Sequence, residues 1–273
     1  MPAYPLAGRT MVVSGASRGI GLAIAVAAAT RGANIVLLAK TAQPHPRLPG
    51  TVHSAVAEIE AAGGKAVAVV GDVRREEDVR RAARTAVDRF GGIDICVNNA
   101  SAIAVEPTES LPAKRFDLMQ EINVRGTFLL TQACLPALRE APEAHVLTIS
   151  PPLNLSPRWL GAHPAYTQSK YAMTLLSLGW ATEFAGAIAV NCLWPQTYIA
   201  TSAVANMADG SALLDSARDP AIMGDAAAEI LSRPAKYTTG NCYIDAEVLI
   251  ESGVCDLSGY GGGERPIPDL FLD

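Results

Sequence analysis

The amino-acid sequence predicts an α/β fold in which one doubly wound, parallel sheet of seven strands is covered by helices on both faces. Short apolar runs rich in β-branched residues alternate along the chain with segments of helical periodicity. This alternation is typical of βαβ units, whose strands run parallel. The 273 residues suffice for one large domain, and nothing in the composition indicates a second core. We therefore expect a single domain over residues 1–273, with a flexible tail from about residue 258.

The predicted elements follow one another in a regular order. The strand candidates are the apolar runs at residues 10–14, 34–39, 65–70, 93–98, 145–150, 187–193 and 241–245. Apolar residues spaced three or four positions apart predict helices at about residues 19–31, 51–62, 75–90, 113–139 and 164–184. Several of these helices are followed by glycine, as helix ends often are: Gly32, Gly63 and Gly91.

Two stretches interrupt the alternation. One is the proline-rich loop "KTAQPHPRLPG" after the second strand, and the other is the irregular region at residues 197–220 after the sixth strand. Both follow the carboxyl ends of strands, where open parallel sheets bind their ligands. We therefore expect both stretches to face the functional site.

Charge and composition exclude several classes of function. The net charge is -5, and Lys and Arg are scattered, so neither nucleic acid nor a membrane surface is an expected partner. The five cysteines form no CxxC pair, which indicates reduced thiols and a cytoplasmic location. The four histidines lack metal-ligand spacing, and we expect no metal. No stretch resembles an export signal or a membrane span.

The stretch "SGASRGIG" lies between the first strand and the first helix. Gly15, Gly19 and Gly21 would let backbone amides at the helix N-terminus approach a pyrophosphate. Ser17, Arg18 and Ile20 lie in the same turn and are further cofactor-binding candidates. A purely structural tight turn is the alternative. We favour a dinucleotide-binding domain of the Rossmann type, because the position between strand and helix near the start of the chain is the one that such a site requires.

The end of the second strand predicts which dinucleotide is bound. An acid at this position would bind the ribose 2'-hydroxyl, but the sequence has "LLAK", with Lys40 and no acid. Lys40, with Arg18 and the nearby Arg47, supplies cations for a 2'-phosphate. The predicted cofactor is therefore NADP(H).

Polar residues at the ends of the third and fourth strands are further candidates. In "GDV", Asp72 could accept a hydrogen bond from an adenine amino group, with Val73 beside it, although a solvated acid is an alternative. In "CVNNA", Asn99 could either bind the cofactor or pin the strand ends together.

Two helices carry residues suited to proton chemistry. Tyr166 and Lys170 are four residues apart, so they share one helix face. A lysine held there would favour the tyrosinate and make the phenol an acid or base. Asn123 is a polar residue in the otherwise apolar "EINVRGTFLLTQA", and a buried asparagine needs partners, which a water chain could supply.

Together these motifs resemble the short-chain dehydrogenase/reductase family over nearly the whole chain. They are the glycine motif, Asp72, "NNA", Asn123, and Tyr166 with Lys170 as the YxxxK pair. The resemblance implies reversible hydride transfer between a nicotinamide and a carbonyl or secondary alcohol. It implies that Tyr166 passes the proton, that Lys170 lowers the tyrosine pKa and holds the nicotinamide ribose, and that Asn123 keeps a relay water. It also leads us to expect a homodimer or homotetramer.

A closer resemblance is to the hydroxysteroid dehydrogenase-like protein 2 subgroup. It rests on "AKTAQPHPRLPGT", "ISPPLNL", "LWPQT" and the ending "PDLFLD". Some members of that subgroup continue into a sterol-carrier domain, which we do not expect within these 273 residues. The subgroup name implies a lipid-like small-molecule substrate.

The sequence departs from the family where a catalytic serine is usual. Leu153 stands thirteen residues before Tyr166, and Pro151 occupies the other position at which the serine could fall. Ser150, Asn154 and Ser156 are the remaining candidates for a hydrogen-bond donor to the substrate oxygen. We predict Asn154, whose amide NH2 can donate to a developing oxyanion. The missing serine also leaves an alternative function, that of a catalytically weak NADP(H)-binding sensor or scaffold.

Overall fold

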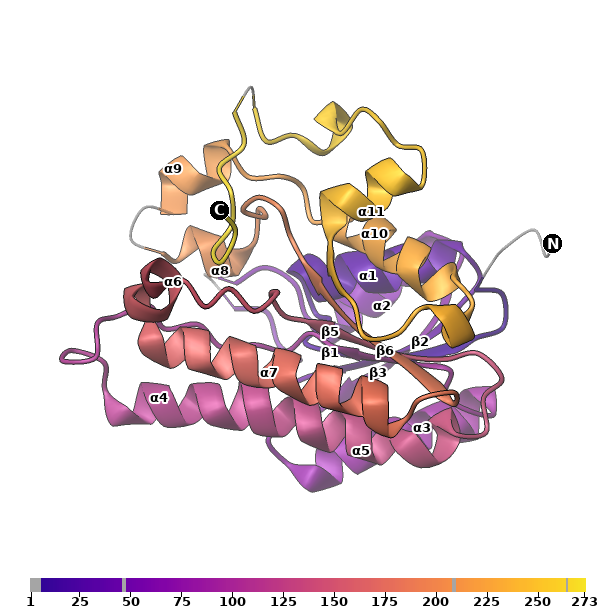
Figure 1. The fold of residues 1–273 in the computed structure, drawn as a ribbon. Coiled ribbons are helices and arrows are strands. Elements are labelled where there is room, and N and C mark those ends of the chain that lie inside the picture. The colour runs from indigo at the N-terminus through magenta and orange to yellow at the C-terminus, as the bar shows by residue number, and fades with distance from the viewer. Residues whose placement is uncertain (1–5, 46–47, 208–209, 264) are drawn as a thin grey trace.

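A computed structural model describes residues 6–45, 48–207, 210–263 and 265–273. Its seven strands form one sheet in the order β3-β2-β1-β4-β5-β6-β7 (Figure 1), and every neighbouring pair is parallel. The strands are β1 (Thr10–Ser14), β2 (Asn34–Ala39), β3 (Lys65–Val70), β4 (Ile95–Asn98), β5 (Ala144–Ile149), β6 (Ile188–Trp194) and β7 (Cys242–Ile244). The predicted fold class is confirmed. The order reverses between β1 and β4, and such a switch point is where parallel sheets bind ligands at their carboxyl edge.

Alternate residues of the strands fill two separate cores. Met11 and Ile35 are paired in register and enter the core on one face, whereas the next pair, Val12 and Val36, enters the core on the other. This alternation follows from the pleat, which directs successive side chains to opposite faces. Strands buried on both faces are expected when helices cover both sides of the sheet.

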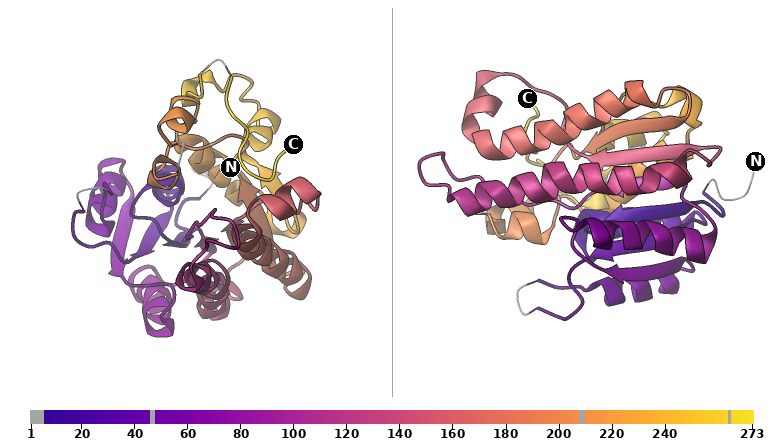
Figure 2. Two further views of the ribbon diagram at one scale, coloured as in Figure 1. Left: turned by 90° about the vertical axis from the view of Figure 1, so that its left-hand side faces the viewer. Right: turned by 90° about the horizontal axis from the view of Figure 1, so that it is seen from below.

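One layer of helices covers each face. The first face carries α1 (Gly19–Thr30), α2 (Val52–Ala61), α10 (Ala221–Ser232) and α11 (Asp245–Glu251), and the second carries α3 (Glu76–Phe90), α5 (Thr127–Leu138) and α7 (Pro164–Glu183). Helix α4 (Ala113–Met119) continues through a π-helix, η1 (Gln120–Gly126), into α5. This long helix lies beside α7 (Figure 2). The short helices are α6 (Pro157–Ala162), α8 (Ser202–Ala205) and α9 (Gly210–Asp215), with 3-10 turns η2 (Ala235–Tyr237) and η3 (Ser258–Tyr260).

Helix α10 lies closely on α1 and was not predicted from the sequence. A Cβ on Gly224 would lie 2.6 Å from the Ala23 carbonyl oxygen, so only glycine permits this approach. The helix is buried on most sides, and it therefore lacks the polar face that periodicity arguments use.

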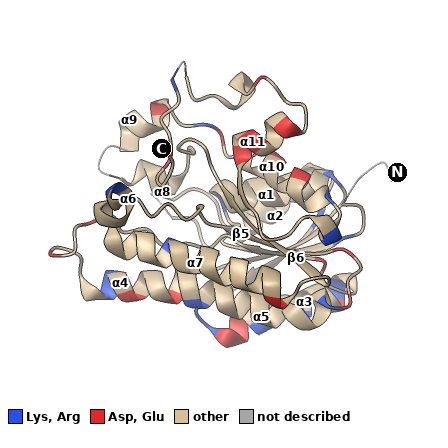
Figure 3. Cartoon of the chain, viewed as in Figure 1, with Lys and Arg blue, Asp and Glu red and all other residues tan. Residues whose placement is uncertain are grey.

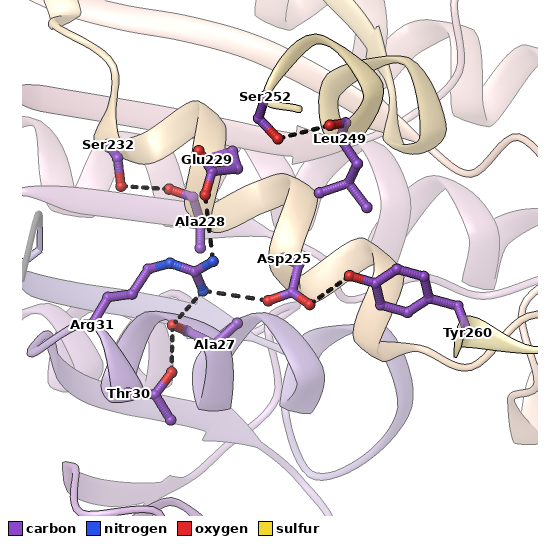
Figure 4. A network of polar contacts seen from close by, with 10 residues as sticks. All are labelled: Ala27, Thr30, Arg31, Asp225, Ala228, Glu229, Ser232, Leu249, Ser252 and Tyr260. Carbon is purple, nitrogen blue, oxygen red and sulfur yellow. Dashed lines mark hydrogen bonds and ion pairs between the residues drawn. The ribbon is translucent and has the colours of Figure 1, made fainter. Parts of the chain in front are cut away.

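A polar network joins this helix pair to the end of the chain (Figure 4). The Arg31 guanidinium lies 3.4 Å from carboxylate oxygens of both Asp225 and Glu229. The Tyr260 hydroxyl donates to Asp225 at 2.8 Å. These contacts hold η3 on α10, and the chain leaves η3 toward the carboxyl edge of the sheet.

The end of the chain differs from the flexible tail that the sequence predicts from about residue 258. Residues 265–273 return to the carboxyl edge of the sheet near α6 and α8 (Figure 1), and Leu270 and Phe271 are buried there. They join an aromatic cluster that contains Trp159, Tyr166 and Trp194. Burial of these apolar side chains explains why the described part of the segment is packed rather than free.

Charged residues of both signs lie along the described helices and loops in the view of Figure 3. Figure 3 shows Lys and Arg spread over several helices and loops and interleaved with Asp and Glu. Among the described residues, none of the helices combines the length and the apolar character that crossing a membrane requires.

Candidate active site

The turn after β1, residues 14–21, is shaped by its glycines and by Asn99. Gly15 and Gly19 have φ values of 68° and 57°, a left-handed conformation that favours glycine. A Cβ on Gly21 would overlap the Asn99 Nδ2 atom and lie 2.9 Å from the Gly15 carbonyl oxygen. Asn99 Nδ2 donates to the Ser14 oxygen at 2.9 Å and to the Gly15 oxygen at 3.2 Å. The sequence leaves two roles open for Asn99, cofactor binding and the pinning of strand ends. These hydrogen bonds correspond to the pinning of strand ends.

Helix α1 presents its N-terminus at this turn. Its cap residue, Arg18, is extended with φ -171° and makes no side-chain cap hydrogen bond. First-turn backbone N–H groups without a cap are suited to bind an anion. Ser17 is buried and Ile20 is partly buried beside them. The turn therefore fits the pyrophosphate of a dinucleotide.

The Arg18 guanidinium has a structural task as well. It donates to the Pro49 oxygen and to the Gly50 oxygen, both at 2.7 Å. These bonds tie the proline-rich loop after β2 to the turn after β1. The prediction had Arg18 free for a 2'-phosphate, whereas here its Nε and Nη2 atoms are engaged by the loop.

The ends of β2 and β3 present a cation and an acid. Lys40 is exposed directly after β2, and Val73 is buried after β3. Asp72 is held by the Arg74 guanidinium at 2.7 Å, which lowers the pKa of this carboxyl, with a smaller contribution from the Lys40 charge. Arg47, the other predicted cation, lies outside the described residues.

Asn123 lies in the π-helix η1 and is fully buried. Its Oδ1 accepts from the Ala102 amide at 2.7 Å and from the Ser101 hydroxyl at 3.2 Å. Its Nδ2 donates to the Ser169 hydroxyl of α7 at 3.0 Å and to the Ala102 oxygen at 3.0 Å. Protein groups thus satisfy the buried amide, and Asn123 joins the loop after β4 to the helix that carries Tyr166.

Tyr166 and Lys170 lie one turn apart on α7, both buried at the carboxyl ends of β5 and β6. Lys170 Nζ donates to the Ile149 oxygen at 2.6 Å and lies 5.0 Å from the centre of the Trp194 ring. The Tyr166 residue is only 5% exposed. The structure thus places the predicted pair at the edge where parallel sheets bind ligands.

Burial dominates the pKa values of this pair. It raises the pKa of Tyr166 well above its usual value, with Asp269 and Tyr198 adding to the shift. It lowers the pKa of Lys170 to about 7, against the opposing effects of Cys192 and Asp269. The expected direction for Tyr166 is reversed in this state, because removal from water disfavours the charged form of each group. A protonated phenol is therefore present at neutral pH.

Asn154 is not directed at a substrate position in this structure. Its Oδ1 accepts from the Ser156 amide at 3.1 Å. Its Nδ2 donates to the Phe271 oxygen at 3.2 Å and to Asp273 Oδ2 at 2.8 Å. The oxyanion role of Asn154 thus stays a prediction, and in this structure its amide hydrogens are used by the end of the chain.

Of the other residues near the usual serine position, Ser150 and Ser156 have hydroxyl oxygens that are buried and make no hydrogen bond within the described part of the chain. Ser150 is fully buried, and its hydroxyl lies beside the Cys192 thiol in the interior. Pro151 accepts a hydrogen bond from the Thr174 hydroxyl at 2.7 Å through its carbonyl oxygen. Leu153 is exposed and apolar. The buried Tyr166 hydroxyl therefore stays the predicted proton donor of this site.

Comparison with known proteins assigns the family. Residues 9–211 match the sequence profile of the family described as short chain dehydrogenase. The chain belongs to this family. A short chain dehydrogenase from Mycobacterium thermoresistibile has a similar structure, with a TM-score of 0.92 and 49% identity over 98% of this chain and 96% of that one. The resemblance found in the sequence is therefore confirmed.

Two curated relatives share the name "Hydroxysteroid dehydrogenase-like protein 2". The protein of Xenopus tropicalis is 52% identical and that of Homo sapiens is 50% identical, each over 98% of this chain. The aligned region makes up 64% of each relative, so the chain spans slightly less than two thirds of their length. The closer resemblance is thus also confirmed, and it concerns the dehydrogenase part.

This short chain dehydrogenase contains site residues that sequence reasoning missed. Phe271 is 2% exposed, and its ring centre lies 5.3 Å from that of Tyr171 and 6.1 Å from that of Tyr166. Trp159 and Trp194 complete its surroundings at 5.8 and 5.9 Å. The apolar ending "PDLFLD" is the available signal, but the sequence alone predicts only a flexible tail at this end.

The backbone at Phe271 is strained. Among the described residues, Phe271 is the one residue other than glycine with a positive φ, which is 74°. Such a conformation costs about 1–3 kcal/mol and persists where the surroundings impose it. The next residues explain the constraint, because the Trp159 indole N–H donates to Asp273 at 3.1 Å and the Trp194 indole N–H donates to the Leu270 oxygen at 2.9 Å.

Proposed function

We propose that this protein is an NADP(H)-dependent oxidoreductase that interconverts a carbonyl compound and a secondary alcohol carrying a lipid-like apolar group. The observation that carries the proposal is the position of Tyr166 and Lys170, which are buried together at the carboxyl edge of the sheet. Membership in the short chain dehydrogenase family supports the reaction class. A bound nicotinamide would supply or accept the hydride.

The chain's own residues fit the cofactor. The uncapped start of α1 and the close approach at Gly21 suit a pyrophosphate. Lys40 would meet a 2'-phosphate, next to the loop that Arg18 holds in place. Asp72 would contact the adenine. These assignments distinguish NADP(H) from NAD(H) only through charge, which makes Lys40 the residue to test.

Proton transfer is assigned to α7. In the direction of carbonyl reduction, the Tyr166 hydroxyl donates its proton to the substrate oxygen. Lys170 lies one turn away, and its charged form would stabilise the tyrosinate left behind. Asn123 acts as a positioning residue, because its bond to Ser169 fixes the turn of α7 between Tyr166 and Lys170.

A lipid-like substrate is supported by the apolar rim of the site. Leu153, Leu155 and Leu160 are exposed on the loop after β5 and on α6, close in sequence to the Trp159 side chain of the aromatic cluster. Exposed apolar side chains on the segments that lead to a site are suited to bind an apolar ligand. The rim therefore favours a substrate with an extended apolar group.

Assembly and location follow the same proposal. Phe116, Phe128 and Leu175 are exposed on the neighbouring helices α4, α5 and α7. A homodimer or homotetramer would bury them. The described cysteines are free thiols, which is consistent with a cytoplasmic protein.

The decisive test compares two tyrosine variants. NADPH oxidation is followed by absorbance with a panel of ketones and aldehydes. Tyr166→Phe should lower kcat by roughly 10²- to 10⁴-fold, as expected for loss of a general acid, with NADPH affinity nearly unchanged. Tyr237→Phe is the matched control, because Tyr237 is 79% exposed. Full activity of Tyr166→Phe would contradict the proposal.

A second candidate is a nucleotide-binding sensor or scaffold with little turnover. It is favoured by one observation: Leu153 and Pro151 stand where a serine is usual, and Asn154 is engaged by the end of the chain. NADPH binding, measured by its fluorescence, without oxidation on the whole panel would select this function.

A further inference from the structure

Residues 265–273, here called the C-terminal segment, form one side of the site around Tyr166. The segment runs antiparallel to the chain after β6. The Tyr198 amide donates to the Ile267 oxygen at 3.1 Å, and the Asp269 amide donates to the Gln196 oxygen at 3.1 Å. The segment is therefore placed by backbone pairing beside the end of β6, where Trp194 contacts Lys170.

The Phe271 ring is directed inward from this segment. It is enclosed by the rings of Trp159, Tyr166, Tyr171 and Trp194. Tyr166 is the proton donor of the proposed reaction, so the substrate's reacting oxygen must come close to a ring that Phe271 already touches. The apolar part of the substrate then meets the Phe271 side of the site.

Three side chains fix the position of Phe271. Asn154 donates to its carbonyl oxygen and to Asp273, while the indoles of Trp159 and Trp194 bind the residues on either side of it. On its other side the C-terminal segment borders a cavity of about 370 Å³, lined in part by Pro268, Leu272 and Arg218. Around Phe271 the segment therefore depends on these bonds and on the aromatic contacts, in addition to the backbone pairing with residues 196–198.

We propose that Phe271 determines substrate specificity by forming the apolar wall opposite Tyr166, and that Asn154 is the positioning residue that holds this wall in place. The inference rests on the proposed function and names the residues that would select the apolar group of its substrate. It gives Asn154 a role distinct from that of an oxyanion donor, because its amide acts on the C-terminal segment and not on the substrate oxygen.

The first experiment compares a small and a long ketone, cyclohexanone and 2-decanone. Phe271→Ala opens space in the wall. The kcat/KM for 2-decanone, divided by the kcat/KM for cyclohexanone, should therefore rise by roughly tenfold or more. Asn154→Ala should shift the ratio in the same direction, mainly through KM, because it releases the same wall. Ile267→Ala is the control, since Ile267 belongs to the segment but is exposed, and it should leave the ratio unchanged.

If Asn154 were instead the donor to the substrate oxyanion, the kinetic result would differ. Asn154→Ala would then lower kcat by roughly 10²-fold on both ketones, with no change in their ratio and no parallel effect in Phe271→Ala. That outcome would overturn the positioning role. An unchanged ratio in Phe271→Ala would overturn the specificity role.

A spectroscopic measurement tests the geometry without turnover. Trp159 and Trp194 both contact Phe271 and donate to the C-terminal segment, so their fluorescence should report its release. Emission should shift to longer wavelength in Phe271→Ala and in Asn154→Asp, which cannot donate to Asp273, but not in Ile267→Ala. Unchanged emission in the first two variants would contradict the proposal. Failure of the proposed function would appear separately, as absence of turnover on every ketone by the unmodified protein.

Discussion

The two sides of the site are built in different ways. On the cofactor side, the turn after β1 is held by Asn99, which bonds to backbone oxygens at the ends of β1. On the substrate side, aromatic side chains from α6, α7, β6 and the C-terminal segment meet around Phe271. The first side is made of backbone groups in a strand–turn–helix unit, and the second is made of side chains that adapt by packing.

This difference corresponds to the two ligands, since the cofactor pyrophosphate is always the same and the apolar substrate group can vary. A pyrophosphate has constant geometry, so close backbone approach and left-handed glycines serve it with little tolerance for change. An apolar substrate group is recognised through shape and burial, which several combinations of side chains can supply. We therefore expect substitutions on the cofactor side to weaken cofactor binding, and substitutions on the substrate side to alter substrate preference.

The largest effect on cofactor binding is expected at Gly21. In Gly21→Ala the new Cβ would overlap Asn99 Nδ2, and the strain of about 1–3 kcal/mol should weaken NADPH binding by roughly 10- to 100-fold. Fluorescence titration with NADPH measures the Kd. Gly179→Ala on α7 is the control, because its Cβ would meet no atom within 4 Å. Equal NADPH affinity in both variants would show that the turn is not a rigid cofactor cradle.

An intermediate effect is expected at Lys40. Replacing a cation with an acid turns attraction for a 2'-phosphate into repulsion, so Lys40→Asp should reduce the preference for NADPH over NADH by roughly tenfold or more. The ratio of the two Kd values is the measurement. Lys65→Asp provides the control, since Lys65 is exposed at the opposite end of the sheet, at the start of β3. Equal binding of NADPH and NADH by the unmodified protein would contradict the assignment of Lys40 to the 2'-phosphate.

The smallest effect is a pH slope on the substrate side. Burial raises the pKa of Asp269 to about 7, with Asp245 adding to the shift and Lys170 opposing it. The folded protein therefore binds a proton that the unfolded chain loses at its ordinary pKa, and stability falls as pH rises from about 4 to 7. Asp269→Asn should flatten this slope in urea unfolding. Lys170, with its pKa lowered to about 7, makes stability rise with pH only above that pH and adds no slope below it.

Asp72 on the cofactor side is an internal control, because its effect on the pH dependence of stability has the opposite sign to that of Asp269. Arg74 lowers the pKa of Asp72, so the contribution of Asp72 is present above its ordinary pKa and is lost as pH falls below it. Asp72→Asn should therefore change only the acid limb of the stability profile. A pH profile that Asp269→Asn leaves unaltered would mean that the C-terminal segment does not bury this carboxyl in solution.

The sequence was informative where neighbours along the chain decide the structure. The glycine turn and the Tyr166–Lys170 spacing are local, and both were found in the expected elements. Even so, the choice between two roles for Asn99 needed the position of β1 beside β4, which no local pattern specifies.

The substrate side could not be predicted in the same way. The bond between Asn154 and Phe271 joins residues 117 positions apart. A register count placed Asn154 next to the usual serine position, but only the folded chain shows where its amide hydrogens go. The "PDLFLD" ending has an apolar character without periodicity, so its burial depends on the aromatic surroundings that the rest of the fold supplies.

The π-helix η1 gives the long helix α4–α5 a change of phase. Each additional residue in a helical turn rotates the following side chains by about 100°. Met119, at the end of α4, accordingly belongs to the aromatic cluster, whereas Leu130 of α5 belongs to the core beneath the sheet. One rod thus presents different faces to two layers, with Asn123 at the point of rotation. A regular α-helix over the same residues would turn the side chains after Asn123 by about 100° from their present direction, so the π-helix is what lets one rod pack against both layers.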